Sequence, residues 1–402
     1  MKRRLREIVV CGVLTAVAAV AVGDGAAWAT TAEAATPAMP SVGVVAAPPD
    51  APAASASDLV ASLSTRQKAA AVVMGHLPTT DPGALRAYMS DTGIGGFILM
   101  GANVPRDESA LRAVTRALTP DDALPPLLAI DQEGGDVSRL PWDDFEAATT
   151  LKSEPASATR SAFAGRAALV LRAGIGVNFG IVADVTADPG SFIYRRALGT
   201  SPETGAERVS AAVDAESGSA LSTLKHFPGH GAAPGDSHVG IPSTSMPESA
   251  WAGAEAAPFR AGIEAGAPLV MFGHLAYTEV DAAPASLSET WHRIVREDLG
   301  FDGVAITDDL GMLEASGIPE YRDPVANAVE ALAAGSDMVL TVLYSDASTA
   351  PRIVDGIVAA VDDGSLPVER LDEAARRVTT LRLALAAAGE ALLPCTDCAA
   401  VG

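Results

Sequence analysis

Short apolar runs that end in a polar residue alternate with helical segments along this chain, and this alternation limits the possible folds more than any other feature. The runs expected to be strands are 94–100, 127–130, 176–185, 221–225, 269–272, 304–307 and 338–341, and the helical segments are 108–118, 161–173, 204–216, 249–265, 287–299 and 324–334. Strands that alternate with helices form parallel sheets. About seven or eight such units predict an α/β fold, a single TIM-like (β/α)8 barrel with irregular strands, and the competing architecture is a doubly wound open sheet.

Polar side chains follow these strands at the points where they end. They are Asp131 after 127–130, Lys225 and His226 at the end of 221–225, His274 after 269–272, and Asp308 with Asp309 after 304–307. In a barrel the carboxyl ends of all strands open onto one face, and active sites are built there. We therefore expect these residues to meet, although they are far apart in the sequence.

The two ends of the chain differ in composition from this central part. Residues 1–29 combine basic residues, an apolar stretch too short to span a bilayer, and an Ala27-Trp28-Ala29 pattern, which predicts a signal peptide cleaved after Ala29. Residues 30–57, rich in Ala and Pro, are expected to be a flexible leader. The barrel is expected over 58–390, followed by a non-catalytic tail over 391–402 in which Cys395 and Cys398 could form a disulfide. These features predict a secreted or cell-wall-associated protein without stable membrane insertion after cleavage.

Charge excludes one class of partner. The chain has 50 acidic and 28 basic residues and a net charge of −22. Binding to nucleic acids depends on clustered Lys and Arg, so no nucleic-acid partner is expected. The sequence has no GxGxxG after a strand and no Walker sequence, so it lacks the usual signals of nucleotide binding, and we expect no cofactor.

Three of the six histidines lie within thirteen residues. One interpretation is a metal site built from His226, His230, Asp236 and His238, but Lys225 would place a positive charge beside the ion. Another is a histidine oriented by a carboxylate: Asp236 can bind one ring nitrogen of His238 and leave the other for proton transfer. A third is a polar loop whose histidines only satisfy backbone groups. We favour the oriented histidine and predict no metal.

Asp308 directly follows an apolar strand. A carboxylate in this position can attack the anomeric carbon of a sugar and form a covalent intermediate that water hydrolyses. By composition alone its neighbour Asp309 is an equal candidate, although the residues that follow Asp309 also suit a helix N-cap.

Four motifs, in this order, resemble glycoside hydrolase family 3, specifically its β-N-acetylglucosaminidase (NagZ-like) branch. They are 129–135 (AIDQEGG) with Arg139, 225–231 (KHFPGHG), 236–238 (DSH) and 306–312 (ITDDLGM), and their spacing covers the chain from about 58 to 388. The resemblance implies that Asp308 is the nucleophile, with Asp309 as structural support. It also implies that His238 is the general acid/base and Asp236 its partner, on a mobile loop after the fifth strand. The residues implied to hold the sugar are Asp131, Arg139, Arg196, Lys225 and His226.

The resemblance implies a retaining enzyme that removes terminal β-linked N-acetylglucosamine from peptidoglycan fragments or chitooligosaccharides. Histidine suits the acid/base role, because imidazole titrates near neutrality, whereas a second carboxylate beside the nucleophile would need a raised pKa. The expected partner is an oligosaccharide containing N-acetylglucosamine, and the protein is expected to be a monomer.

Four other functions remain open. A β-glucosidase of this family typically has a second domain that supplies a carboxylate acid/base. A phosphorylase would use phosphate as acceptor, and histidine repels phosphate less than a carboxylate does. A non-catalytic cell-wall binding protein is disfavoured by the presence of both Asp308 and His238. The fourth is a metal-dependent amidohydrolase.

A few positions depart from the family pattern or are ambiguous. Asp136 stands where the family usually has Arg, and Leu198 stands where Phe is common. Asp184 and His274 lie near strand ends, where each could be either a buried, hydrogen-bonded residue or a contact to the ligand.

Overall fold

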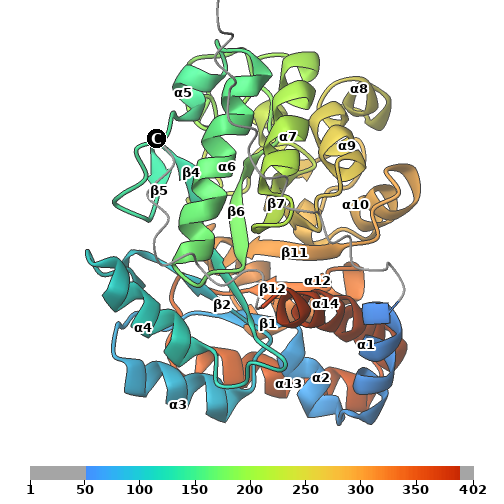
Figure 1. Ribbon diagram of the computed structural model, residues 1–402. Coiled ribbons are helices and arrows are strands. Elements are labelled where there is room, and N and C mark those ends of the chain that lie inside the picture. The colour runs from blue at the N-terminus through green and yellow to red at the C-terminus, as the bar shows by residue number, and fades with distance from the viewer. Residues whose placement is uncertain (1–50, 390–402) are drawn as a thin grey trace, which may run out of the picture. The chain divides into compact units, whose positions relative to one another are not determined.

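The computed structural model describes residues 51–389, and in it eight parallel strands close into a barrel surrounded by helices (Figure 1). The strands follow the order β1-β12-β11-β9-β7-β6-β3-β2 around the barrel. Their bounds are β1 Val73–Gly75, β2 Gly96–Leu99, β3 Leu127–Ile130, β6 Val177–Val182, β7 Leu221–Phe227, β9 Leu269–Phe272, β11 Val304–Asp309 and β12 Met338–Leu340. The predicted TIM-like barrel is confirmed, and the open sheet is excluded.

The α-helices lie between and around these strands. Their bounds are α1 Ala51–Ser62, α2 Thr65–Ala71, α3 Pro82–Thr92, α4 Glu108–Leu118, α5 Ala148–Leu151, α6 Ala156–Arg172, α7 Pro202–Glu216, α8 Glu248–Gly253, α9 Ala256–Glu264, α10 Glu289–Arg293, α11 Gly311–Ala315, α12 Pro324–Ala334, α13 Thr349–Asp363 and α14 Val368–Ala388. Two small sheets pair β4 (Gln132–Gly134) with β5 (Val137–Ser138), and β8 (Ser243–Thr244) with β10 (Ala276–Tyr277). Within residues 51–389, no helix has the length and apolarity needed to cross a membrane.

Side chains alternate between two cores along each strand. In β3, Leu127 and Ala129 belong to the cluster inside the barrel, whereas Leu128 and Ile130 pack under the outer helices. In a strand successive side chains point to opposite faces, so both faces of a barrel strand must be apolar. This explains why the strands appear in the sequence as continuous apolar runs.

Several elements differ from the sequence-based expectation, and three of them show why. The predicted helix 249–265 is divided into α8 and α9, because Ala254 leaves the helical region with φ −129° and ψ −88°. The predicted helix 287–299 is shorter and continues from α10 into a π-helix, Ile294–Asp298. Strand β1 was not predicted, because three residues are too few to show a period.

The end of the predicted leader overlaps the first helix. Helix α1 begins at Ala51, so residues 51–57 are helical. Alanine is the best helix former, and the helix packs against α14 with Ala56 and Val60 buried. The predicted signal peptide, the leader up to residue 50, and the tail with Cys395 and Cys398 lie outside the described residues.

Glu216, at the end of α7, is fully buried beside the barrel. Its Oε1 accepts a 2.6 Å hydrogen bond from Asn178 Nδ2, and its Oε2 has no hydrogen-bond partner within residues 51–389. Burial raises the pKa of Glu216 to about 8. A carboxyl whose pKa is raised in the folded state stabilises the protein below its unfolded pKa of about 4, and this stabilisation is lost as the pH rises through 8.

We therefore expect Glu216→Gln to become more stable relative to the wild type as the pH rises from 5 to 8, by on the order of 2 kcal/mol. The measurement is the free energy of unfolding by urea at each pH. Glu207→Gln, on the exposed side of the same helix, is the matched control and should follow the wild type. Identical pH profiles for Glu216→Gln and the wild type would contradict the raised pKa.

Candidate active site

A cavity of about 450 Å³ opens at the carboxyl ends of the barrel strands. All but one of the residues predicted for the site line it: Asp131, Arg139, Arg196, Lys225, His226, His238 and Asp308. Asp236 does not line the cavity but is hydrogen-bonded to His238, which does. The structure thus brings together side chains that are separated by up to 177 positions, as the positions of Asp131 and Asp308 show.

The alternation within strands places the reactive groups. On β11, Val304 and Ile306 point into the barrel, so Asp308, two residues further, also points inward at the mouth. Thr307, on the opposite face, instead accepts a hydrogen bond from the Leu340 backbone on the neighbouring strand. The alternation along β11 therefore places the Asp308 side chain on the inner face of the barrel.

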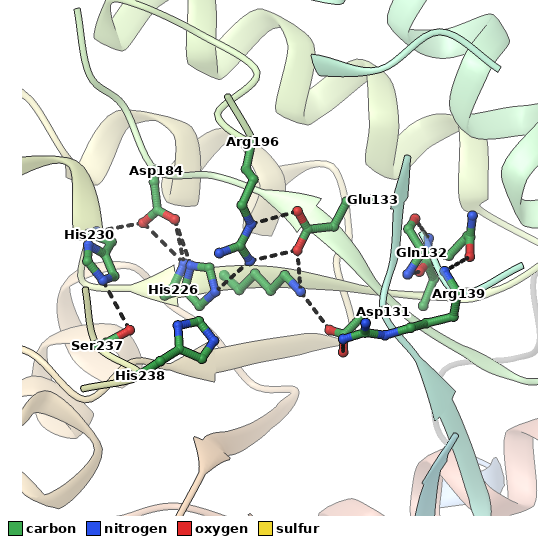
Figure 2. Close-up of polar contacts among 12 residues, drawn as sticks. Asp131, Gln132, Glu133, Arg139, Asp184, Arg196, His226, His230, Ser237 and His238 are labelled. Atoms are coloured by element: carbon green, nitrogen blue, oxygen red, sulfur yellow. Dashed lines mark hydrogen bonds and ion pairs between the residues drawn. The ribbon is translucent and has the colours of Figure 1, made fainter. Parts of the chain in front are cut away.

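One lysine joins two carboxylates in the wall of the cavity. Lys225 Nζ lies 2.8 Å from Asp131 Oδ1 and 2.7 Å from Glu133 Oε1. Arg196 forms a two-pronged pair with Glu133, with distances of 2.7 and 2.9 Å, and Arg139 Nη2 lies 3.4 Å from Asp131 Oδ2 (Figure 2). Burial opposes ionisation of Asp131, but Lys225 and Arg139 lower its pKa to about 2. These ion pairs join the groups into one polar wall.

Asp308 is held ionised by its surroundings. Burial acts against the charge, but interactions with His226 and His274, the hydrogen bond from the Asp309 backbone and the charge of Lys225 keep the pKa of Asp308 below its ordinary value. One of its oxygens accepts a 2.8 Å hydrogen bond from the Asp309 backbone. A half-buried carboxylate that stays ionised and faces a cavity has the properties of a nucleophile.

Asp309 has a different environment, although it also borders the cavity. Its Oδ1 accepts hydrogen bonds from the backbone N–H groups of Gly311 and Val342, and its Oδ2 accepts one from Leu343. Burial, together with the charge of Asp308, raises the pKa of Asp309 to about 6. Asp309 therefore ties the start of α11 to the segment after β12.

Asp184 and His274 are buried behind the site and do not line the cavity. Asp184 Oδ2 lies 2.7 Å from His226 Nδ1, and Asp184 Oδ1 accepts a 2.6 Å hydrogen bond from the His230 backbone. His274 binds Ser286 Oγ through Nδ1 and the Asp309 carbonyl through Nε2. Both are therefore buried, hydrogen-bonded residues that orient the groups at the cavity.

The histidine and aspartate of the DSH motif contact each other. His238 Nδ1 lies 2.7 Å from Asp236 Oδ1, and the same oxygen accepts a 2.9 Å hydrogen bond from the His238 backbone. The His238 side chain is 57% exposed. The three histidines of this region thus bind Asp184, Ser237 and Asp236 separately, and residues 51–389 contain no group of three or more His, Cys, Asp or Glu that could hold a metal ion.

The two departures from the family pattern have different consequences. Asp136 borders the cavity and pairs with Arg195, at 2.5 and 2.9 Å, so a carboxylate is matched there by a neighbouring guanidinium. Leu198 is 2% exposed and packs in the core rather than at the cavity. Of these two positions, Asp136 therefore lies at the rim of the cavity, and Leu198 lies in the core.

Two functional positions were missed from the sequence. Glu133 lies within the first motif, two residues after Asp131. In an extended chain alternate side chains point to the same face, so Glu133 could have been expected beside Lys225, as Asp131 is. Phe192 lies at the rim, 36% exposed, with its ring centroid 5.6 Å from that of His238 and 5.4 Å from that of His230. No periodicity marks Phe192, because it lies in a loop.

Comparisons with known proteins agree with this arrangement. The family profile described as the glycosyl hydrolase family 3 N terminal domain matches residues 65–381. A protein of Xanthomonas oryzae pv. oryzae named beta-hexosaminidase is 37% identical over 63% of this chain and 78% of its own length. A beta-hexosaminidase of Thiobacillus denitrificans is 34% identical over 69% of this chain and 77% of its own length.

Two solved structures share the fold. A family 3 beta-N-acetylglucosaminidase of Paenibacillus sp. has a TM-score of 0.73 and 28% identity, covering 80% of this chain and 63% of that protein. LpqI of M tuberculosis has the same TM-score and identity, covering 81% of this chain and 96% of LpqI. Since the profile spans most of the barrel and the cavity holds the residues of all four motifs, this chain belongs to glycosyl hydrolase family 3 and is a glycoside hydrolase.

Proposed function

We propose that this enzyme is a secreted, retaining β-N-acetylglucosaminidase that releases terminal β-linked N-acetylglucosamine from peptidoglycan fragments or chitooligosaccharides. The observation that carries the proposal is that a half-buried Asp308, whose pKa is lowered, borders the same cavity as His238, which is paired with Asp236. The names of the relatives, beta-hexosaminidase and beta-N-acetylglucosaminidase, support the choice of sugar.

The proposed reaction has two steps. Asp308 attacks the anomeric carbon, and the bond to the leaving-group oxygen breaks while His238 gives that oxygen its proton. Water then attacks the glycosyl-enzyme, His238 takes the proton of the water, and the carboxylate of Asp308 is released. His238 Nδ1 is bound to Asp236, and Nε2, which has no hydrogen-bond partner within residues 51–389, transfers the proton.

The wall of the cavity has groups suited to bind a sugar. The ionised Asp131 and the guanidinium of Arg139 can accept and donate hydrogen bonds to hydroxyls. Arg196, Lys225 and His226 add donors to the same wall, and all five border the cavity. A wall of oriented donors and acceptors suits a neutral sugar, whose recognition depends on many oriented hydrogen bonds.

The test is a comparison of paired aryl substrates. We expect hydrolysis of 4-nitrophenyl N-acetyl-β-glucosaminide at a kcat/KM at least about a hundredfold above that of the glucoside, because unfilled polar groups reject an analogue that lacks their partner. The released sugar should be N-acetylglucosamine both with and without phosphate. Release of N-acetylglucosamine 1-phosphate would identify a phosphorylase. A histidine acid/base is also compatible with that reaction, because it repels phosphate less than a carboxylate does. Preference for the glucoside would contradict the proposed sugar.

A further inference from the structure

The segment 234–240 carries Asp236 and His238 but has few contacts with the barrel. Within residues 51–389, the hydrogen bond between Ser237 Oγ and His230 Nε2, at 3.2 Å, is the one side-chain hydrogen bond that joins this segment to the rest of the protein. The His238 ring also packs edge-on against Phe192. The position of the proposed acid/base therefore depends on very few interactions.

Ser237 differs from both of its neighbours in its environment. It is 4% exposed, whereas the side chains of Asp236 and His238 are 39% and 57% exposed. Although Ser237 borders the cavity, its hydroxyl binds the His230 ring, as Figure 2 shows. A buried hydroxyl needs such a partner, because an unpaired one would lose its hydrogen bond to water.

His230 is a fixed point for this contact. Its backbone N–H binds Asp184 Oδ1, and the other oxygen of Asp184 binds His226, which lines the cavity. The backbone after His230 lies close to the Val185 backbone, because the next residue is Gly231. A Cβ at Gly231 would lie 1.7 Å from the Val185 carbonyl oxygen. One buried carboxylate thus orients a residue of the cavity wall and the anchor of the segment with His238.

We propose that His230 and Ser237 are positioning residues, whose hydrogen bond holds the segment 234–240 so that His238 lies at the cavity. This inference rests on the proposed function, because it assigns the task of proton transfer to His238. Phe192 supports the same arrangement, since its ring contacts both the His230 and the His238 rings. Loss of the bond should free the segment and lower the fraction of molecules in which His238 can reach the leaving group.

The effect should depend on how much the leaving group needs a proton. For Ser237→Ala we expect kcat/KM for phenyl N-acetyl-β-glucosaminide to fall about tenfold, the change in a conformational equilibrium that one hydrogen bond produces. The value for the 2,4-dinitrophenyl substrate, whose leaving group departs without a proton, should change less than about twofold. A residue that only stabilises the fold or binds the sugar would affect both substrates equally.

Three further variants complete the experiment. His238→Ala should show the same selectivity with a larger loss, about 10²- to 10⁴-fold on the phenyl substrate. Ser237→Thr, which keeps the hydroxyl, should recover most of the activity. Val239→Ala, in the same segment and 74% exposed, is the matched control and should leave both substrates unchanged.

The outcomes separate the two proposals. If His238→Ala shows the selective loss and Ser237→Ala does not, the positioning role is wrong and the acid/base assignment stands. Equal losses on both substrates for Ser237→Ala would likewise overturn the positioning role. If His238→Ala does not lose more activity on the phenyl substrate than on the 2,4-dinitrophenyl substrate, the acid/base assignment fails, and the inference that rests on it fails as well.

Discussion

Asp308→Asn should lower kcat for an aryl N-acetyl-β-glucosaminide by at least about 10⁴-fold, the scale seen when the nucleophile of a covalent mechanism is removed. The amide has nearly the same shape as the carboxylate but cannot attack the anomeric carbon. The pKa of Asp308 is already below its ordinary value, so the wild type keeps the nucleophile ionised at neutral pH. The measurement is steady-state release of the aryl group.

A matched control and a direct test accompany this variant. Asp302→Asn changes an exposed aspartate that precedes the same strand β11, and it should retain wild-type activity. Incubation of the wild type with 5-fluoro-N-acetyl-β-glucosaminyl fluoride, which keeps the N-acetyl group, should increase the mass of the peptide that contains Asp308. Activity of Asp308→Asn within tenfold of the wild type, or labelling of Asp309 instead, would refute the assignment of the nucleophile.

Lys225→Met should cost about 3–5 kcal/mol of unfolding free energy at neutral pH, because removal of one partner leaves buried charges without compensation. Lys225 is 2% exposed and contacts both Asp131 and Glu133. The variant should also lose activity, since the wall that is expected to bind the sugar would lose its central cation. The measurement is urea unfolding together with kcat/KM.

The pH dependence of this deficit has a definite sign. In the wild type the pKa of Asp131 is about 2, below its unfolded value, so its stabilising contribution is present above pH 4 and is lost only as the pH falls through 2. Without Lys225 the pKa of the two carboxyls should rise, so the deficit should shrink between pH 7 and pH 4. Lys68→Met, which breaks a partly exposed pair with Asp372, should cost at most about 1 kcal/mol at either pH. A deficit that grows towards pH 4 would contradict this account.

Elements with strong local signals were predicted to the residue. Helices α4 and α12 and strands β3 and β9 have the same bounds in the sequence-based expectation and in the structure. In the two helices a capping residue marks the first turn: Asp107 caps α4, and Asp323 caps α12 and precedes Pro324. In the two strands the apolar run has the same length as the strand. The break between α8 and α9 could not be predicted, since Ala254 is a good helix former that tertiary packing places outside the helix.

The sequence by itself determined the parallel α/β class, the order of the motifs, and the strand-end positions of Asp131, Lys225 and Asp308. Strand periodicity and the common direction of barrel strands are local or topological rules, so these conclusions needed no coordinates. For the choice between Asp308 and Asp309 the sequence offered the resemblance and a possible N-cap role of Asp309, whereas the backbone hydrogen bonds that occupy Asp309 were visible only in the structure.

Only the tertiary structure decided the partners of the buried charges. Glu133 joins Lys225 and Arg196, and Asp184 joins His226 to His230, across separations of 42 to 92 residues that no local pattern encodes. Burial makes such pairings necessary, because an isolated charge away from water is costly, but which partner satisfies it depends on how the loops meet at the barrel mouth. The reactive residue types were therefore visible in the sequence, whereas their orientation and protonation follow from contacts that exist only in the folded barrel.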